Sequence, residues 1–235
     1  MSTIAIELAN LSTELSGLFP PGTLAADLRG VAETSVLYPE EAAYVQASAP
    51  IRAQEFAAGR LCARRLLHEF GIDNFPIRVG DNRQPVWPDS LVGSITHTAG
   101  FCAAVAARKR DLCALGIDAE LDGSVKPELQ HRICTPDETA WLRSLPEAER
   151  TSAATLIFSA KEAFYKCQYS ITQERLGFSA AVIEVPAWGL AQGSFVIHAN
   201  QPLALQRTAP QPLQGRYLFR EQIVVAGIAL AAADQ

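Results

Sequence analysis

The order of the predicted elements indicates an α+β protein. A long amphipathic helix is expected over residues 50–70, and three strand-like segments follow it within residues 91–118. Two more helical segments come next, and the chain ends in four segments with strand character. Helices and strands come in runs rather than in regular alternation, which is typical of the α+β class. We therefore predict two comparable halves, each with a helix and a group of strands.

The first long helix is predicted from an apolar stripe that recurs at helical spacing. The helix is expected to begin at Pro50, and Gly71 suits the left-handed position after its last residue. The side chains expected on the buried stripe are Phe56, Leu61, Cys62, Leu66, Leu67 and Phe70. The region before this helix, residues 1–30, contains short apolar and turn-rich pieces, and Pro39 can begin a short helix.

The remaining elements are predicted from apolar alternation, helical periodicity and turn residues. The first strands expected, joined by short turns, are Leu91–Thr96, Phe101–Ala107 and Leu112–Asp118. Helices are expected over Pro136–Leu145, with Thr135 as its N-cap, and over Ser152–Gln168. The strands expected in a second sheet are Phe178–Val185, Gly193–Ala199, Gly215–Phe219 and Gln222–Leu230.

Composition excludes several classes of protein. With 235 residues, of which 49% are hydrophobic, the chain can bury a substantial core. Its net charge of −5 and the absence of a long Lys/Arg run argue against nucleic-acid binding. Five scattered cysteines without a C-x-x-C pair argue against a disulfide framework and a zinc site. No apolar run approaches the roughly 18–20 residues that span a bilayer, and no secretory signal is evident. We expect a monomeric, cytoplasmic protein.

Two segments carry the charged residues that matter most for function. The segment F-S-A-K-E-A-F-Y-K, which ends at Lys166, is predicted to be helical, so Glu162 and Lys166 lie on one face. The segment G-I-D-A-E continues a predicted strand, where alternation places Asp118 and Glu120 on the same side. Mg²⁺ prefers oxygen ligands and is commonly held by carboxylates together with substrate phosphates. Three carboxylates and one ammonium therefore predict a site for a hard divalent cation and a phosphate.

Each segment also has an ordinary structural interpretation. A Glu and a Lys four residues apart on a helix usually form a solvated pair that contributes about 0.2–0.5 kcal/mol. An Asp-x-Glu at the end of a strand is commonly a polar entry into a turn. Lys161 lies about 100° around the helix from Glu162, which is compatible with a surface or interdomain charge and equally with a phosphate contact.

Together, the two segments resemble the paired signatures of the 4′-phosphopantetheinyl transferases, G-[IV]-D-x-E and [FW]-S-x-K-E-[AS]-x-x-K. Every constrained position of both signatures is filled, in the right order. The resemblance extends to R-A-Q-E-F-A-A-G-R, which begins at Arg52, to the Arg-Gln-Pro step at Arg83 and to G-S-I-T-H, which ends at His97. It covers roughly residues 50–185 and is closest to the larger, surfactin-type group, in the branch of the enterobactin synthase D component.

This resemblance implies a fold and a reaction. The fold has two similar α/β halves related by a pseudo-twofold axis, with the active site in the cleft between them. The implied halves are residues 1–111, on the nucleotide and 3′-phosphate side, and residues 112–235, with the metal and the catalytic helix. The implied reaction moves the 4′-phosphopantetheine group of coenzyme A to a serine of an apo acyl, peptidyl or aryl carrier protein and releases adenosine 3′,5′-bisphosphate. Nonribosomal peptide, siderophore or polyketide synthesis would use such carriers.

The resemblance also suggests a role for individual residues. Asp118, Glu120 and Glu162 fit as ligands of Mg²⁺, and Glu162 and Lys166 fit as the catalytic pair. The residues expected to contact coenzyme A are Arg52, Arg60, Arg83, Thr96, His97, Asp118 and Lys166. The other histidines, His68, His131 and His198, are expected to be structural.

Two departures from the family pattern concern the carrier and pantetheine surfaces. Cys167 and Gln168 follow Lys166 where the branch often has an aromatic-proline step, and Ala180 and Ala181 stand where an acidic residue is common. Two other functions compete: a different Mg²⁺-dependent phosphoanhydride enzyme, and a coenzyme A-binding protein without catalysis. The chain has no Walker-type glycine loop, which argues against the former.

Overall fold

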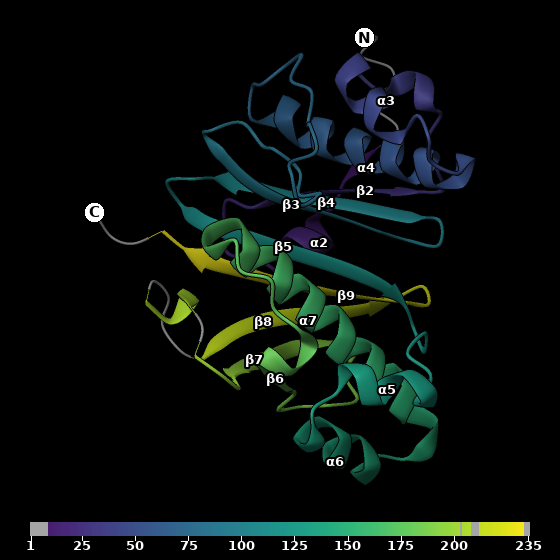
Figure 1. The fold of residues 1–235 in the computed structure, drawn as a ribbon, viewed down its shortest axis with the longest axis vertical. Helices are drawn as coiled ribbons and strands as arrows, with labels where there is room; N and C mark the ends of the chain where they lie inside the picture. The colour runs from purple at the N-terminus through teal and green to yellow at the C-terminus, as the bar shows by residue number, and fades with distance from the viewer. Residues whose placement is uncertain (1–8, 203, 208–211, 233–235) are drawn as a thin grey trace. The chain divides into compact units, whose positions relative to one another are not determined.

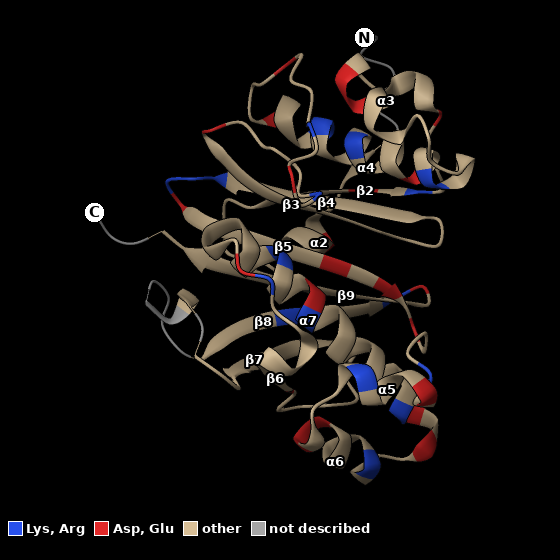
Figure 2. Cartoon of the chain, viewed as in Figure 1, with Lys and Arg blue, Asp and Glu red and all other residues tan. Residues whose placement is uncertain are grey.

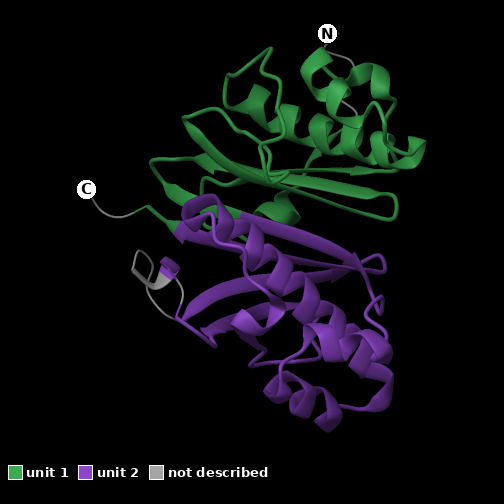
Figure 3. Cartoon of the chain, viewed as in Figure 1, with its two compact units in different colours: residues 1–115, 231–235 green, residues 116–230 purple. Residues whose placement is uncertain are grey.

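The computed structural model describes residues 9–202, 204–207 and 212–232. The chain forms two compact units, residues 1–115 with 231–235 (unit 1) and residues 116–230 (unit 2) (Figure 3). Both units combine helices with an antiparallel sheet, so the predicted α+β class is confirmed. Among the described residues, every helix is too short or too polar to cross a membrane. The assignment of nucleotide and metal roles to halves divided at residue 111 stays a prediction.

Unit 1 is built around a sheet with the strand order β1-β2-β4-β3 (Figure 1). Its strands are β1 (Asn10–Leu11), β2 (Leu24–Arg29), β3 (Leu91–Thr98) and β4 (Phe101–Arg108). Its helices are α2 (Thr13–Ser16), α3 (Pro39–Val45) and α4 (Pro50–Glu69), with a 3₁₀ turn, η1, at Thr34–Val36. The predicted helix over residues 50–70 and the predicted first two strands are therefore confirmed.

Helix α4 lies along one face of this sheet and contacts β2, β3 and β4 (Figure 1). Leu61, Cys62, Leu66 and Leu67 are buried as predicted, and Gly71 has the expected positive φ of 77°. The prediction was wrong for Phe56 and Phe70, which are only partly buried against the core. Close to Phe56 in sequence, Gly59 approaches the sheet so closely that an added Cβ would lie 2.9 Å from Ile95 Cγ2.

Unit 2 contains a sheet with the strand order β5-β9-β8-β7-β6. Its strands are β5 (Leu112–Leu121), β6 (Ala181–Glu184), β7 (Gln192–Ala199), β8 (Leu213–Arg220) and β9 (Ile223–Ala231), of which β5 begins in unit 1. Its helices are α5 (Pro127–Ile133), α6 (Pro136–Ser144) and α7 (Arg150–Thr172), and its 3₁₀ turns are η2 (Glu147–Glu149), η3 (Phe178–Ala180) and η4 (Ala204–Arg207). The predicted N-cap at Thr135 is confirmed, since its hydroxyl accepts a hydrogen bond from Glu138 N.

Three features differ from the sequence-based prediction. Strand β2 was missed because Ala25–Leu28 is buried on consecutive positions and lacks the alternation of a half-exposed strand. Strand β5 joins the second sheet, whereas the strand pattern grouped it with the two strands before it; the halves implied by the family resemblance had put residues 112–235 together. The strand predicted to begin at Phe178 begins at Ala181, because residues 178–180 form a 3₁₀ turn in which Ala180 N donates to Gly177 O.

Strand β5 and helix α7 approach each other so closely at Gly116 that no side chain fits between them. An added Cβ would collide with the Ala163 carbonyl oxygen and would lie 2.9 Å from the Ala163 carbonyl carbon and 3.0 Å from Cys167 Cβ. The glycine of G-I-D-A-E is therefore required by packing. Its contact brings the strand that carries Asp118 against the helix that carries Glu162.

Gly116→Ala is predicted to destabilise the fold, because backbone atoms of α7 cannot move aside as a flexible side chain would. We expect a loss of about 1–3 kcal/mol or more, as for other overpacked sites, measured by denaturant unfolding. Gly177→Ala is the matched control, since nothing lies within 4 Å of an added Cβ there. Equal stability of the two variants would contradict the packing argument.

Candidate active site

The predicted metal and phosphate residues of unit 2 lie where β5 ends against the middle of α7. Figure 2 shows acidic positions on β5 and charges of both signs on α7. Asp118 is 5% exposed, and its backbone oxygen accepts a hydrogen bond from Ser159 Oγ at 3.2 Å. This bond, together with the close approach at Gly116, fixes the strand end relative to the helix.

Lys166 links the helix to the strand. Its Nζ donates to Asp118 Oδ1 at 2.7 Å and to the Ile117 backbone oxygen at 3.0 Å. The side chains of Lys166 and Asp118 are 27% and 6% exposed. The ammonium thus pairs with a nearly buried carboxylate on the neighbouring strand, and it remains reachable from solvent.

The two other carboxylates, Glu120 and Glu162, have raised pKa values. Burial, the charge of Asp118 and, to a lesser extent, Glu162 raise the pKa of Glu120 from 4.5 to about 7 against the opposing effect of Lys166. Burial and then the charge of Asp118 raise the pKa of Glu162, again opposed by Lys166. These mutual effects mean that the three carboxylates share one electrostatic environment, whose negative charge one ammonium offsets only in part.

Among the described residues, no three His, Cys, Asp or Glu side chains form a ready-made metal-binding group. The chemistry of the three carboxylates nevertheless fits a hard divalent cation. Glu120 and Glu162 have raised pKa values because they are partly buried near like charge, and a bound cation would stabilise their ionised forms. The residues that would hold it are Asp118, Glu120 and Glu162.

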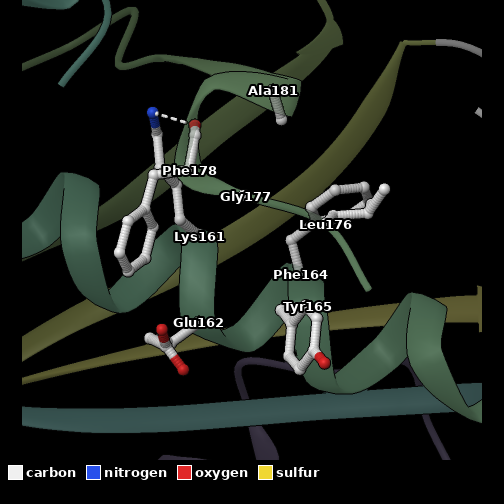
Figure 4. Close-up of a pocket in the computed structure, with 8 residues that line it drawn as sticks. All are labelled: Lys161, Glu162, Phe164, Tyr165, Leu176, Gly177, Phe178 and Ala181. Carbon is white, nitrogen blue, oxygen red and sulfur yellow. Dashed lines mark hydrogen bonds between the residues drawn. The ribbon is translucent and has the colours of Figure 1, made fainter. Parts of the chain in front are cut away.

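A pocket of about 160 Å³ opens beside Glu162 (Figure 4). Its lining comes from α7 and from the segment that leads into β6. The residues that line it are Lys161, Glu162, Phe164, Tyr165, Leu176, Gly177, Phe178 and Ala181. Since most of these side chains are apolar, the pocket suits a slender, largely uncharged group attached to one that reaches the carboxylates.

Lys161 has neither of the roles that the sequence left open. Its side chain is 3% exposed, and its Nζ donates to Glu138 Oε2 at 2.7 Å and to the backbone oxygens of Ile133 and Phe178 at 2.9 and 2.8 Å. The ammonium is therefore neither a surface charge nor available to a phosphate. Figure 4 shows it directed toward Phe178 and away from the Glu162 carboxylate.

In unit 1 the two predicted arginines of α4 differ in environment. Arg52 is exposed, whereas Arg60 is 6% exposed and its Nε donates to the Ile77 backbone oxygen at 2.9 Å. Burial lowers the pKa of Arg60 to about 10. Its guanidinium lies 3.9 Å from the centre of the Phe56 ring, which stacks on Tyr44 at 5.5 Å. These aromatic contacts hold the guanidinium in one orientation.

Arg83 lies in a tight turn of unit 1. Its φ is 68°, an uncommon value for a residue with a side chain. Its backbone N donates to Gly80 O at 2.9 Å, and Gly80 N donates to Gln84 O at 2.8 Å, across an isolated bridge between Val79 and Pro85. These hydrogen bonds fix the backbone at Arg83, and its side chain is exposed to solvent.

Thr96 and His97 lie on opposite faces of β3. Gly59 of α4 packs against Ile95, so Ile95 and His97 face α4, and Thr96 faces away from it. The His97 Nδ1 lies 3.8 Å from Glu55 Oε2, and its side chain is 38% exposed, whereas Thr96 is 3% exposed. The structure thus groups His97 with α4 and separates Thr96 from it.

Several residues around these sites were missed from the sequence. The apolar residues Leu176 and Phe178 carry no motif, and only the folded chain brings them to Glu162. Tyr165 could have been found, because it follows Glu162 by three residues on a helix and so lies near it. The stacking of Tyr44 on Phe56 joins two helices and had no signal in the sequence.

Comparison with known families assigns both parts of the chain. Residues 40–107 match the 4′-phosphopantetheinyl transferase N-terminal domain, and residues 114–218 match the 4′-phosphopantetheinyl transferase superfamily.

Individual relatives match over most of the chain. The 4′-phosphopantetheinyl transferase Svp of Streptomyces mobaraensis is 38% identical over 201 residues, which are 84% of this chain and 80% of Svp. The 4′-phosphopantetheinyl transferase Npt of Nocardia iowensis is 30% identical over 220 residues, 91% of this chain and 98% of Npt. Enterobactin synthase component D of Salmonella typhi is 40% identical over 136 residues, 56% of this chain and 54% of that protein.

Glu120→Gln is predicted to stabilise the metal-free protein at neutral and alkaline pH. In the folded chain the pKa of Glu120 is about 7 rather than 4.5, so between these values the folded state holds a proton that the unfolded state lacks. The free energy of unfolding therefore falls as pH rises from about 4.5 to about 7 and stays reduced above it. Melting temperatures are measured in the presence of a chelator at about pH 8 and about pH 4. Glu120→Gln should melt at a higher temperature than the parent only at about pH 8. The control variant is Glu128→Gln, at an exposed position, and it should melt at the same temperature as the parent at both pH values. A melting temperature of Glu120→Gln equal to that of the parent at both pH values would refute the burial argument.

Proposed function

The chain belongs to the 4′-phosphopantetheinyl transferase superfamily, and we propose that it moves the 4′-phosphopantetheine group of coenzyme A to a serine of an apo carrier protein. The observation that supports this reaction most directly is the gathering of Asp118, Glu120, Glu162 and Lys166 where β5 meets α7. A reaction at a pyrophosphate needs positioned cations and carboxylates, and little else from the protein. The similarity to transferases over both family regions argues against a general phosphoanhydride enzyme. The intact set of Asp118, Glu120, Glu162 and Lys166 argues against an inactive coenzyme A-binding protein.

The proposed chemical step is an attack by the serine oxygen on the β-phosphorus of coenzyme A. The new serine–phosphorus bond forms, the bridging phosphorus–oxygen bond breaks, and adenosine 3′,5′-bisphosphate leaves with the bonding electron pair. Lys166 stabilises the negative charge that grows on this leaving group, since its ammonium is oriented by Asp118 and reachable from solvent. Glu162, the carboxylate of the site that also lines the pocket, is the proposed acceptor of the serine proton.

Mg²⁺ is the proposed metal, held by Asp118, Glu120 and Glu162, and when bound it supplies Lewis-acid stabilisation of pyrophosphate oxygens. The preference for magnesium follows from an all-oxygen donor set. Lys166 alone leaves Glu120 with a pKa of about 7, so the site gains from a second cation.

The pocket beside Glu162 is proposed to hold the pantetheine arm. The arm is a narrow chain of amides and methylenes, and the pocket is lined largely by apolar residues from Phe164 to Ala181. Because the pocket lies next to Glu162, an arm bound in it would place the β-phosphorus to which it is joined near the carboxylates (Figure 4).

Unit 1 is proposed to bind the 3′-phosphate and the nucleotide. Arg52, Arg60, Arg83 and His97 are the cationic candidates, and the fixed orientation of Arg60 on Phe56 supports a bidentate phosphate contact. Thr96 faces away from α4, so we propose that it contributes through a separate contact.

The proposed partners are apo carrier proteins or carrier domains of nonribosomal peptide, siderophore or polyketide assembly. The similarity to a protein named enterobactin synthase component D supports the siderophore class first.

The function is tested by incubation of the protein with coenzyme A, Mg²⁺ and a panel of apo carrier proteins, each read by mass spectrometry. We expect a gain of one phosphopantetheine group on at least one carrier. Lys166→Met should lower the single-turnover rate on the order of a hundredfold, with a smaller effect on coenzyme A affinity. Lys109→Met, in the exposed turn after β4, is the control and should transfer like the parent. A parent-like rate for Lys166→Met would remove Lys166 from the chemistry.

Arg52→Ala and Arg60→Ala test the nucleotide contacts. Each should raise KM for coenzyme A roughly ten- to a hundredfold, through loss of one charge-assisted contact, and should affect 3′-dephospho-coenzyme A far less. Arg60→Ala should also lower the melting temperature, because it removes the hydrogen bond to Ile77 O. Arg52→Ala should leave the melting temperature unchanged, because Arg52 is exposed. Equal losses on both substrates would place these arginines elsewhere than at the 3′-phosphate.

A further inference from the structure

We infer that Lys161, paired with Glu138, is a positioning residue that fixes the wall of the pocket beside Glu162 and thereby sets where the pantetheine arm lies. The inference rests on the proposed function of that pocket. It concerns a residue next to Glu162 in sequence whose own ammonium does not reach the reacting groups.

All three hydrogen atoms of the Lys161 ammonium are engaged. The acceptors are Ile133 O at the end of α5, Glu138 Oε2 in α6 and Phe178 O in η3, at 2.9, 2.7 and 2.8 Å. The ion pair is almost completely buried, with side-chain exposures of 3% for Lys161 and 0% for Glu138. A buried ammonium with three acceptors holds its partners in a narrow range of positions, since any displacement leaves a buried polar group unpaired.

Glu138 extends the connection to two more backbone groups. Its Oε2 accepts from Thr135 N at 2.7 Å, and its Oε1 accepts from Ile183 N in β6 at 2.7 Å. One ion pair therefore ties α7 to α5, α6, η3 and β6. The segment from Leu176 to Ala181 forms the wall of the pocket that faces α7. One of these attachment points, Phe178 O, lies inside this segment, and another, Ile183 N, follows it.

Other contacts hold the wall on both sides of Phe178. Two residues before the wall, Gln168 Nε2 donates to Glu174 O at 2.9 Å, and at its end Asn200 N donates to Ala180 O at 2.9 Å. Between them, the Phe178 ring contacts the Phe158 ring with centroids 5.6 Å apart. Asn200 Nδ2 also donates to Ser179 O at 3.0 Å, so the C-terminal part of the wall is held through Asn200. The bond from Lys161 is a polar attachment at Phe178 itself, and its loss would release Phe178 while the residues on either side stay held.

A catalytic role for Lys161 does not fit this geometry. Figure 4 shows the ammonium bound to Phe178 O on the side of the pocket away from the Glu162 carboxylate. A phosphate could recruit it only by breaking bonds to a carboxylate and two carbonyls in a buried site. Its effect on the reaction must therefore pass through the wall.

The test compares Lys161→Met, Lys161→Arg and two controls. Lys109→Met removes an exposed lysine of unit 1, and Leu218→Ala removes a buried side chain of β8 that does not line the pocket, which controls for lost stability. For each variant, dissociation constants of coenzyme A and of adenosine 3′,5′-bisphosphate, which lacks the arm, are measured by calorimetry. Single-turnover transfer to a saturating apo carrier is measured separately.

We expect Lys161→Met to weaken coenzyme A binding roughly tenfold and to slow transfer, with adenosine 3′,5′-bisphosphate affinity unchanged within about twofold. Lys161→Arg should recover part of the loss, because it keeps the charge but not the compact three-way geometry. Leu218→Ala should bind both ligands like the parent. If Lys161→Met does not fold, the dissociation constants of the same two ligands for Lys161→Arg test the positioning role.

Equal weakening of both ligands, or a parent-like result for every Lys161 variant that folds, would overturn the positioning role. A parent protein that modifies no carrier would instead overturn the proposed function. A parent that transfers normally while Lys161→Met binds both ligands like the parent would overturn only the present inference.

Discussion

The contact of β5 with α7 at Gly116 is the constraint on which the site depends. A strand and a helix can approach this closely only where a side chain is missing, and here the missing Cβ lets the Ala163 backbone lie against the strand. Two residues beyond Gly116, the strand carries Asp118, and the facing helix carries Lys166, whose Nζ reaches Asp118 Oδ1 at 2.7 Å. A wider separation would break this ion pair and the Ser159–Asp118 bond together, so packing and site geometry are one arrangement.

Buried charge serves two different purposes in unit 2. Lys161 and Glu138 are desolvated but fully compensated, and such a pair adds little net stability while it makes alternative positions of its partners costly. Glu120 and Glu162 are desolvated and only partly compensated, which raises their pKa values. The second condition costs stability in the protein alone and favours a ligand that brings positive charge. Uncompensated charge is thus concentrated at the site that a cation and a pyrophosphate would fill.

Sequence patterns could predict the parts that depend on local periodicity and on motifs. They located α4 and α7, the N-cap at Thr135 and the positive φ of Gly71, because each follows from residues within a few positions of one another. They missed β2, whose buried positions do not alternate with exposed ones. They also predicted that Phe56 is buried in the core, whereas its ring packs against the Arg60 guanidinium and stacks on the Tyr44 ring. The pocket wall at Leu176 and Phe178 could not be predicted, because those residues meet α7 only through long-range contacts.

The two lysines of α7 show why spacing alone does not assign chemistry. Lys161 and Lys166 are five residues apart, which is about 140° around a helix, so they face different surroundings. The sequence fixes that separation but not which side is buried. In the folded chain Lys161 meets two carbonyls and a buried carboxylate and is withdrawn from solvent, whereas Lys166 meets Asp118 at the edge of the site and stays 27% exposed. The same residue type in one motif is therefore proposed to position the pocket wall in one case and to contact the substrate in the other.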